Sequence, residues 1–386
     1  MTKNSWFSDY NIAVFTLVFM SIQLLFIEGW AVSIPKVVFM AITPALLLIK
    51  SPCISKATIF GGAFIIVTLG MACLHPNENR SSTFYYTALF LCTFNLYYNL
   101  VYINNVFKID DFIKIIKGVI YAYAICLLLQ QLCMLVGINY LPIINLMRQP
   151  YYELFRLNTL AIEPSHAARL MTIYFYAFLK VNEYKYGRGL SLKELFATHK
   201  WIVIAFLYTV IGIGSATSFV GLGILALYFL KKQYAVYVVV FGFTFYMIVP
   251  MIDYEPLNRT MAVFNAAMTA DTEVVKETDN SAAARVNILL DTFKYLDLED
   301  ADTWIGNGTD SSLKSGKAIV SAISDYGMFS YLSKLVFFFV CCFTSFFSLE
   351  VLIFILLFSL NIGNIAYGFA ALMVFSTIKY FRNKEN

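Results

Sequence analysis

The segment from Leu157 to Leu170 (LNTLAIEPSHAARL) gathers reactive side chains in a chain that is otherwise poor in charge. Glu163 precedes Pro164, which predicts the start of a helix because proline fits the first helical turn and keeps the preceding residue extended. His166 and Arg169 are three residues apart and share one face of that helix. A carboxylate in this setting can act as a base toward a hydroxyl group, and His166 is the alternative base.

Arginines around this segment favour an anionic ligand. Arg148 and Arg156 precede the predicted helix, and Arg169 lies within it. A guanidinium donates two parallel hydrogen bonds to phosphate oxygens, and the free amides at a helix N-terminus also attract anions. A lipid-linked phosphate fits these features. A structural reading stays open, with Glu163 as a helix-capping carboxylate and His166 as a packing residue.

The composition indicates the elements that must position these residues. Of the 386 residues, 60% are hydrophobic and 13% are charged, whereas soluble domains carry roughly 25% charged residues. The chain is therefore expected to be an all-α, polytopic membrane protein forming a single domain over 1–386, because apolar runs of about 20 residues cross the membrane as helices. Twelve spans are predicted, near 10–27, 31–49, 58–74, 84–106, 115–136, 164–181, 200–214, 217–230, 234–251, 318–345, 347–361 and 364–380.

The basic residues predict the orientation of these spans, because loops rich in Lys and Arg stay in the cytoplasm. Twelve spans place the basic loops on one side together with both termini, and they place 137–163 and 252–317 on the outer side. The net charge of +4 does not imply nucleic-acid binding, since the basic residues belong to cytoplasmic loops. No cleavable signal peptide is expected, because the apolar stretch from Ile12 is long enough to remain as a span.

The segment 252–317 has soluble character and carries twelve of the chain's 24 acidic residues. A structureless loop of this length is uncommon, so helices are expected in it. Apolar residues spaced by three and four predict an amphipathic helix over 281–296, followed by a turn at 306–308, and this pair suits a lid on the outer membrane surface. Arg259 and Arg285 are either salt-bridge partners or ligand-binding residues. The position of Arg285 at the start of the amphipathic helix favours a function.

Two further groups of residues are open to more than one reading. Ser215 and Ser218 lie in a turn of small residues between two predicted spans, where they either allow tight helix packing or line a sugar site. The seven cysteines lie in or beside apolar runs, so we expect packing residues rather than disulfides or metal ligands.

Four short motifs, in this order and on one predicted face, resemble the O-antigen polymerase (Wzy) family over most of the chain. They are Glu163-Pro164-Ser165 opening a span, the serine-rich turn 215–218, a long outer loop with a helix starting at Arg285 and an end at Gly306-Asn307-Gly308, and Asp325-Tyr326-Gly327 opening a late span. The related O-antigen ligases share the layout. Their His-Asn pair ahead of the late span corresponds to Gly316-Lys317 here, which disfavours the ligase reading.

The resemblance implies a metal-independent glycosyltransferase of the GT-C type, without a cofactor, in the bacterial inner membrane. Such an enzyme moves a growing glycan from undecaprenyl pyrophosphate onto the next lipid-linked repeat unit at the periplasmic face, during lipopolysaccharide biosynthesis. The implied partners are undecaprenyl-pyrophosphate-linked oligosaccharides, membrane lipids, a chain-length regulator and a flippase. The positions carried over are Glu163, Arg285, Asp325 and its neighbour Tyr326, together with Arg156, Arg169 and Arg259.

A lipid-linked oligosaccharide flippase or another transporter is the rival from a different class. Transporters place ionisable residues near the membrane midplane and often contain internal repeats. Here the ionisable residues cluster at the predicted outer ends of spans, which favours an enzyme. Lys36 and Lys334 lie within predicted spans and suit transport better.

Overall fold

The computed structural model describes residues 7–23, 33–75, 81–138, 156–230, 255–268, 277, 296–308, 318–358 and 365–385. Within these ranges every regular element is a helix, which confirms the predicted all-α class. The helices are α1 (Asp9–Ser21), α2 (Ile34–Lys50), α3 (Lys56–Cys73), α4 (Ser81–Tyr102), α5 (Ile109–Leu135), α6 (Pro164–Tyr186), α7 (Leu192–Gly212), α8 (Ala216–Tyr228), α10 (Glu255–Met268), α13 (Ala301–Ile305), α14 (Ala318–Cys341), α15 (Leu349–Phe358) and α16 (Ile365–Glu385).

Each predicted apolar span overlaps one of these helices, except 234–251, which lies outside the described residues, and α1 ends at Ser21, before the predicted end of its span at 27. Three helices, α3, α5 and α7, are long and apolar enough to cross a membrane, and α1, α8 and α15 are shorter apolar helices. These helices indicate a membrane-embedded protein. Helix α7 contains the predicted span 200–214 nearly to its end and extends it upstream. The helix starts at Leu192 because Ser191 and Glu194 form a capping box, and the backbone departs from helical geometry at His199.

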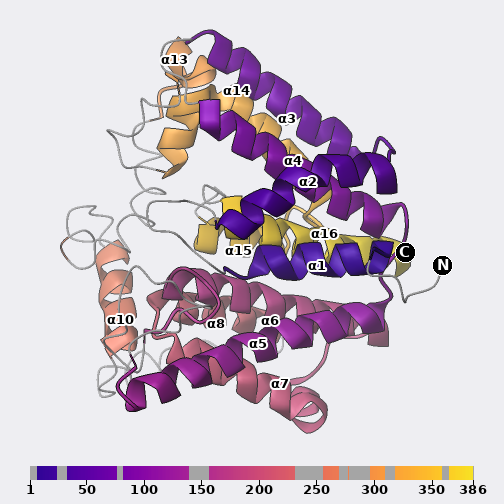
Figure 1. Ribbon diagram of the computed structural model, residues 1–386. Helices are drawn as coiled ribbons and strands as arrows, with labels where there is room; N and C mark the ends of the chain where they lie inside the picture. Colours follow the sequence, from indigo (N-terminus) through magenta and orange to yellow (C-terminus); the bar gives the residue numbers. More distant parts are fainter. Residues whose placement is uncertain are drawn as a thin grey trace.

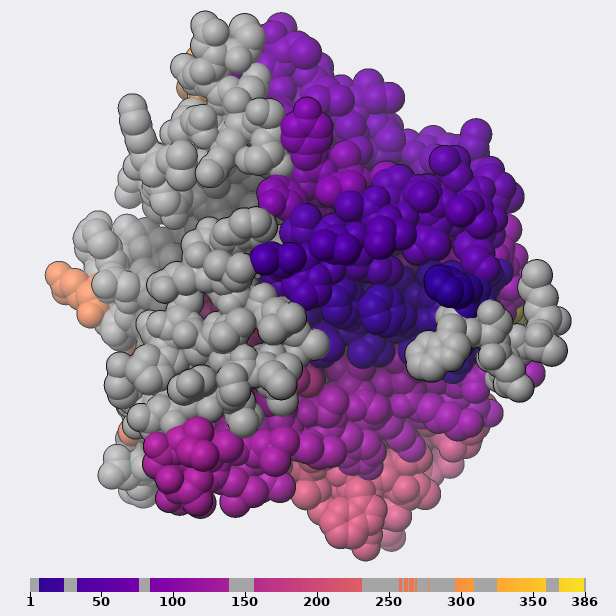
Figure 2. All heavy atoms as spheres, viewed as in Figure 1, coloured from indigo at the N-terminus to yellow at the C-terminus, as the bar shows by residue number. Residues whose placement is uncertain are grey.

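Large apolar side chains are exposed along several helices. An exposed apolar surface of this extent is rare on a soluble monomer, whereas lipid tails cover it readily. In the space-filling view the side chains of α5 and α7 form the lower part of the surface (Figure 2). Exposed examples are Val38, Ile42, Leu48 and Ile49 on α2, Ile59 and Ile66 on α3, Ile125, Leu128, Leu129 and Leu132 on α5, and Phe196, Trp201 and Ile204 on α7.

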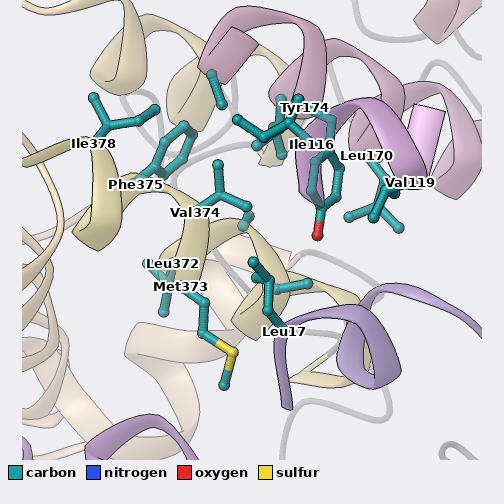
Figure 3. Packing of buried hydrophobic residues seen from close by; sticks show 14 of the residues in the cluster. Leu17, Ile116, Val119, Leu170, Tyr174, Leu372, Met373, Val374, Phe375 and Ile378 are labelled. Atoms are coloured by element: carbon teal, nitrogen blue, oxygen red, sulfur yellow. The ribbon is translucent and has the colours of Figure 1, made fainter. Parts of the chain in front are cut away.

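Helix α6 lies at the centre of its half of the bundle and packs against α5, α7, α8 and α16 (Figure 1). Leu170 and Tyr174 of α6 meet apolar side chains of α5 and α16 in the core (Figure 3). The Tyr174 hydroxyl is hydrogen-bonded to Ser21 Oγ at the end of α1, and the Tyr123 hydroxyl donates to the Ser21 carbonyl at 2.6 Å. These bonds fix the end of α1 against α5 and α6.

The other half of the bundle contains α2, α3, α4 and α14 (Figure 1). Helices α3 and α14 pack together along their length, with Thr68 Oγ1 and Ser330 Oγ 2.5 Å apart. The polypeptide stays helical through Lys334, so this residue does not break the span. The interruption lies instead at Gly327, whose φ of 78° is left-handed.

The predicted cytoplasmic groups gather at one end of the bundle, where both termini lie (Figure 1). Lys50 Nζ lies 3.5 Å from the Asp9 carboxylate, and Lys185 Nζ lies 2.6 Å from the Asp110 carboxylate. The Tyr380 hydroxyl near the C-terminus donates to Asn105, just ahead of α5. The segment 252–317 contributes α10 and α13 at the opposite end (Figure 1), in line with the expectation that this segment contains helices. The predicted helix 281–296 lies outside the described residues.

Candidate functional site

Glu163 occupies the N-cap position of α6, directly before Pro164, as the sequence predicts. Its backbone is extended, with φ of −136° and ψ of 152°, and its side chain makes no capping hydrogen bond. The carboxylate is 58% exposed. A carboxylate that caps a helix folds back onto the backbone amides of the first turn. The Glu163 side chain instead remains available to a ligand at the mouth of α6.

His166 lies in the first turn of α6, on the same face as Glu163. Its Nε2 is 3.7 Å from Glu163 Oε2, and its imidazole is 12% exposed. This separation exceeds a direct hydrogen bond, and polar groups at such a distance can share a bridging hydroxyl or water. The pair can therefore bind a hydroxyl group and remove its proton.

Helices α6 and α8 are parallel, and two contacts define their register. A Cβ on Gly221 would overlap Thr172 Oγ1, and the Tyr228 hydroxyl lies 3.4 Å from the Leu179 carbonyl. In both contacts the residue numbers differ by 49. The same offset puts Ser218 level with Arg169, and Ser215 level with His166. The serine-rich turn and the Glu163 segment, about fifty residues apart in sequence, therefore meet at the same end of this helix pair.

Two buried hydroxyl groups lie at this end. Ser218 is fully buried and Ser165 nearly so, and neither Oγ atom has a hydrogen-bond partner within the described residues. Ser215 is the N-cap of α8, but its side chain makes no capping bond. Buried hydroxyls without a partner are uncommon in native proteins, so these atoms are candidates to bind a ligand. Ser165 was not predicted as a site residue, although its place in the first turn of the predicted helix was a signal.

The two predicted arginines next to this helix pair are placed differently. Arg169 lies on α6, with its guanidinium carbon 5.6 Å from the centre of the Phe358 ring at the end of α15. Arg156 is exposed, and its backbone amide donates to the Gly212 carbonyl at the end of α7 at 3.4 Å. Its φ of 108° is unusual for a residue other than glycine. Both arginines therefore approach the end of the bundle where α6 and α8 begin.

Of the other predicted site residues, Asp325 and Tyr326 lie elsewhere, and the arginines lie wholly or partly outside the described structure. Arg259 lies on α10, which packs against α8, but its side chain is outside the described structure. Arg148 and Arg285 also lie outside the described residues. Asp325 and Tyr326 belong to α14, which packs chiefly against α3 and α13. The structure thus supports two separate groups, one at the start of α6 and one at the kink of α14.

The second group joins the glycine turn 306–308 to the Asp325-Tyr326-Gly327 motif, which lie apart in the sequence. The Gly308 amide donates to the Asp325 carbonyl at 3.0 Å, and Gly306 and Gly308 both have left-handed φ angles. A Cβ on Gly306 would lie 2.5 Å from the Asp325 carbonyl oxygen. The ring centres of Trp304 and Phe329 are 5.1 Å apart, and those of Tyr326 and Phe84 are 6.1 Å apart. Residues 304–308 are therefore fixed to the kink of α14.

Within the described ranges, no three His, Cys, Asp or Glu side chains gather as metal ligands. The seven cysteines are free thiols. Comparisons of this chain with family models, with curated proteins and with solved structures find no match.

Proposed function

We propose that this protein is a membrane glycosyltransferase that polymerises lipid-linked glycans, as O-antigen polymerases do. The observation that carries the proposal is the meeting of Glu163, His166 and Arg169 on α6 with Ser215 and Ser218 on α8, at the shared N-terminal end of two parallel helices. This end offers a base, hydrogen-bonding hydroxyls and an anion-binding guanidinium within a few helical turns.

The chemistry that fits these groups is a direct displacement. An acceptor sugar hydroxyl, deprotonated by Glu163 with His166 as the alternative base, attacks the anomeric carbon of the donor sugar. The bond between that carbon and the pyrophosphate oxygen breaks, and undecaprenyl pyrophosphate leaves as the anion. Arg169 and the amides at the start of α6 and α8 stabilise the departing charge. Positioning of the two substrates and stabilisation of a good leaving group are sufficient for acceleration without a metal.

Two intramembrane lysines bear on the rival transporter function. Lys36 is almost completely buried, and its Nζ donates to the Met20 carbonyl in the last turn of α1 at 3.0 Å. A lysine in this position stabilises the negative end of a helix. Lys334 lies on α14 with its Nζ 5.1 Å from the centre of the Tyr331 ring. A cap and a cation–π contact are local roles, so they favour the enzyme over a transport pathway.

The proposal includes twelve spans in a bacterial inner membrane, with both termini in the cytoplasm and the Glu163 group facing the periplasm. We predict that a reporter active only outside the cytoplasm is active when fused after Glu277 and inactive when fused after Arg188. The reason is that basic loops are retained in the cytoplasm. Reporter activity measured in intact cells checks the prediction. Equal activity at the two positions would contradict the orientation.

The surface polysaccharide of a deletion strain tests the function itself. We expect the strain without this protein to carry a single repeat unit on its acceptor, and plasmid-borne wild-type protein to restore long chains on a gel. Complete loss of attached glycan, single-repeat and long-chain alike, would indicate a ligase or a flippase instead.

A further inference from the structure

The segment 156–163 is a loop with exposed ends, Arg156 and Glu163, and a buried middle. Leu157, Asn158 and Thr159 are at most 1% exposed, although none of them belongs to a helix. Backbone amides and carbonyls in a buried loop need hydrogen-bond partners, because an unpaired polar group away from water is unfavourable. The partners of this loop therefore determine where Glu163 lies.

Gln130 on α5 supplies two of these hydrogen bonds through a single side chain. Its Nε2 donates to the Thr159 carbonyl at 3.2 Å, and its Oε1 accepts from the Thr159 amide at 3.0 Å. Gln130 is fully buried. A carboxamide is suited to this task because it combines a donor and an acceptor, whereas a carboxylate only accepts and an ammonium only donates. Gln130 thus pairs with Thr159 much as a neighbouring β-strand would.

The contacts around this pair hold the loop in an otherwise unfavourable conformation. Thr159 has a left-handed φ of 52°, which a β-branched residue rarely adopts. The backbone N–H of Gln23, just after α1, donates to the Leu160 carbonyl at 2.7 Å. The Asn158 side-chain Nδ2 donates to the Ala161 carbonyl at 2.6 Å. Such a backbone persists only when surrounding groups fix it.

From these contacts we infer that Gln130 is a positioning residue that aligns Glu163 with His166 and with the start of α8. The inference rests on the proposed function of Glu163. Gln130 reaches the loop at Thr159, four residues before Glu163. Its effect on the reaction therefore passes through the conformation of the segment 156–163.

The test compares Gln130→Met with Gln131→Met, in full-length protein purified into lipid nanodiscs. Methionine keeps the length of glutamine but removes both hydrogen bonds to Thr159. Gln131 is the matched control, because this neighbouring glutamine accepts a hydrogen bond from the Tyr208 hydroxyl of α7 at 2.5 Å, whereas Gln130 is bonded to Thr159. The substrate is the lipid-linked repeat unit isolated from the deletion strain.

For Gln130→Met we expect about tenfold faster hydrogen exchange in the peptide covering 156–163, since two buried hydrogen bonds are lost. We also expect kcat to fall about tenfold or more with little change in KM, because misplacement of a reacting group lowers the rate of the chemical step more than substrate binding. Gln131→Met should change neither the exchange of this peptide nor kcat appreciably. If Gln130→Met does not accumulate, Gln130→Glu, which keeps the length and the acceptor, replaces it with the same expected directions.

Equal effects of the two methionine variants would overturn the inference, as would unchanged exchange or a change in KM alone. If the wild-type protein forms no polymer, the proposed function fails. In that case the inferred alignment of Glu163 for this reaction fails with it, while the exchange measurement still decides whether Gln130 orders the loop.

Discussion

Glu163→Gln is expected to insert into the membrane at a normal level and to yield single-repeat product in place of long chains. Glutamine preserves the size of the side chain but cannot accept a proton from the acceptor hydroxyl. Loss of a general base typically lowers the rate by about 10²-fold or more. The Glu163 side chain makes no capping hydrogen bond, so its replacement should cost the fold little. The measurement is chain length on a gel, with the protein level determined by immunoblot.

Glu183→Gln provides the matched control on the same helix. Glu183 lies near the opposite end of α6, where it pairs with Lys180 at 2.8 Å and accepts from the Tyr228 hydroxyl at 2.8 Å. This variant should retain long-chain polymer, because its site is remote from the start of α6. Normal polymer from Glu163→Gln would eliminate Glu163 as the base and leave His166 as the remaining candidate.

Gly327→Ala is expected to prevent stable association of α13 with α14. Gly327 has φ of 78° and ψ of 166°, a conformation nearly restricted to glycine, so alanine there costs on the order of 1–3 kcal/mol by itself. Here a Cβ would also overlap the Trp304 carbonyl oxygen and lie 2.6 Å from the Ile305 carbonyl carbon. These are backbone atoms, which cannot rotate away as a flexible side chain can. Together these effects should destabilise the protein by on the order of 3 kcal/mol or more.

Thermal unfolding in detergent and limited proteolysis measure this effect. We expect a lower unfolding temperature and faster cleavage within 296–308 for Gly327→Ala. Gly62→Ala on α3 is the control, because no atom lies within 4 Å of its Cβ position and its backbone is helical. Alanine at such a position should be neutral or stabilising by up to about 1 kcal/mol. Unchanged stability of Gly327→Ala would show that the contact between the two glycine motifs is dispensable.

Local sequence was sufficient to predict the helical class and the positions of most helices. Apolar runs of membrane-spanning length and the Glu163-Pro164 pair act within a few residues of the chain, so they can be recognised without the fold. Helix α7 extends upstream of the predicted span because its first turns are polar and depend on the capping box of Ser191 and Glu194 rather than on apolar residues. Among the described residues, three helices meet the length and composition requirements of a membrane span.

The candidate site was predictable only in part. Sequence alone identified Glu163, His166 and Arg169 as one group, because a helical repeat places residues three apart on one face. It could not separate Asp325 and Tyr326 from that group. Both motifs lie at predicted outer ends of spans, and only the packing of α14 against α3 and α13 distinguishes their places.

The sequence by itself determined what depends on neighbouring residues: an apolar helical chain, a helix starting at Pro164, and side chains suited to acid–base chemistry and anion binding. The tertiary structure alone decided which distant segments meet. The register of α6 against α8 depends on Gly221 fitting beside Thr172, and the support of the Glu163 loop depends on Gln130. The meeting of Gly306 with Gly327 depends on two backbones approaching closely. Such contacts arise from packing between segments far apart in the chain, and no local pattern encodes them.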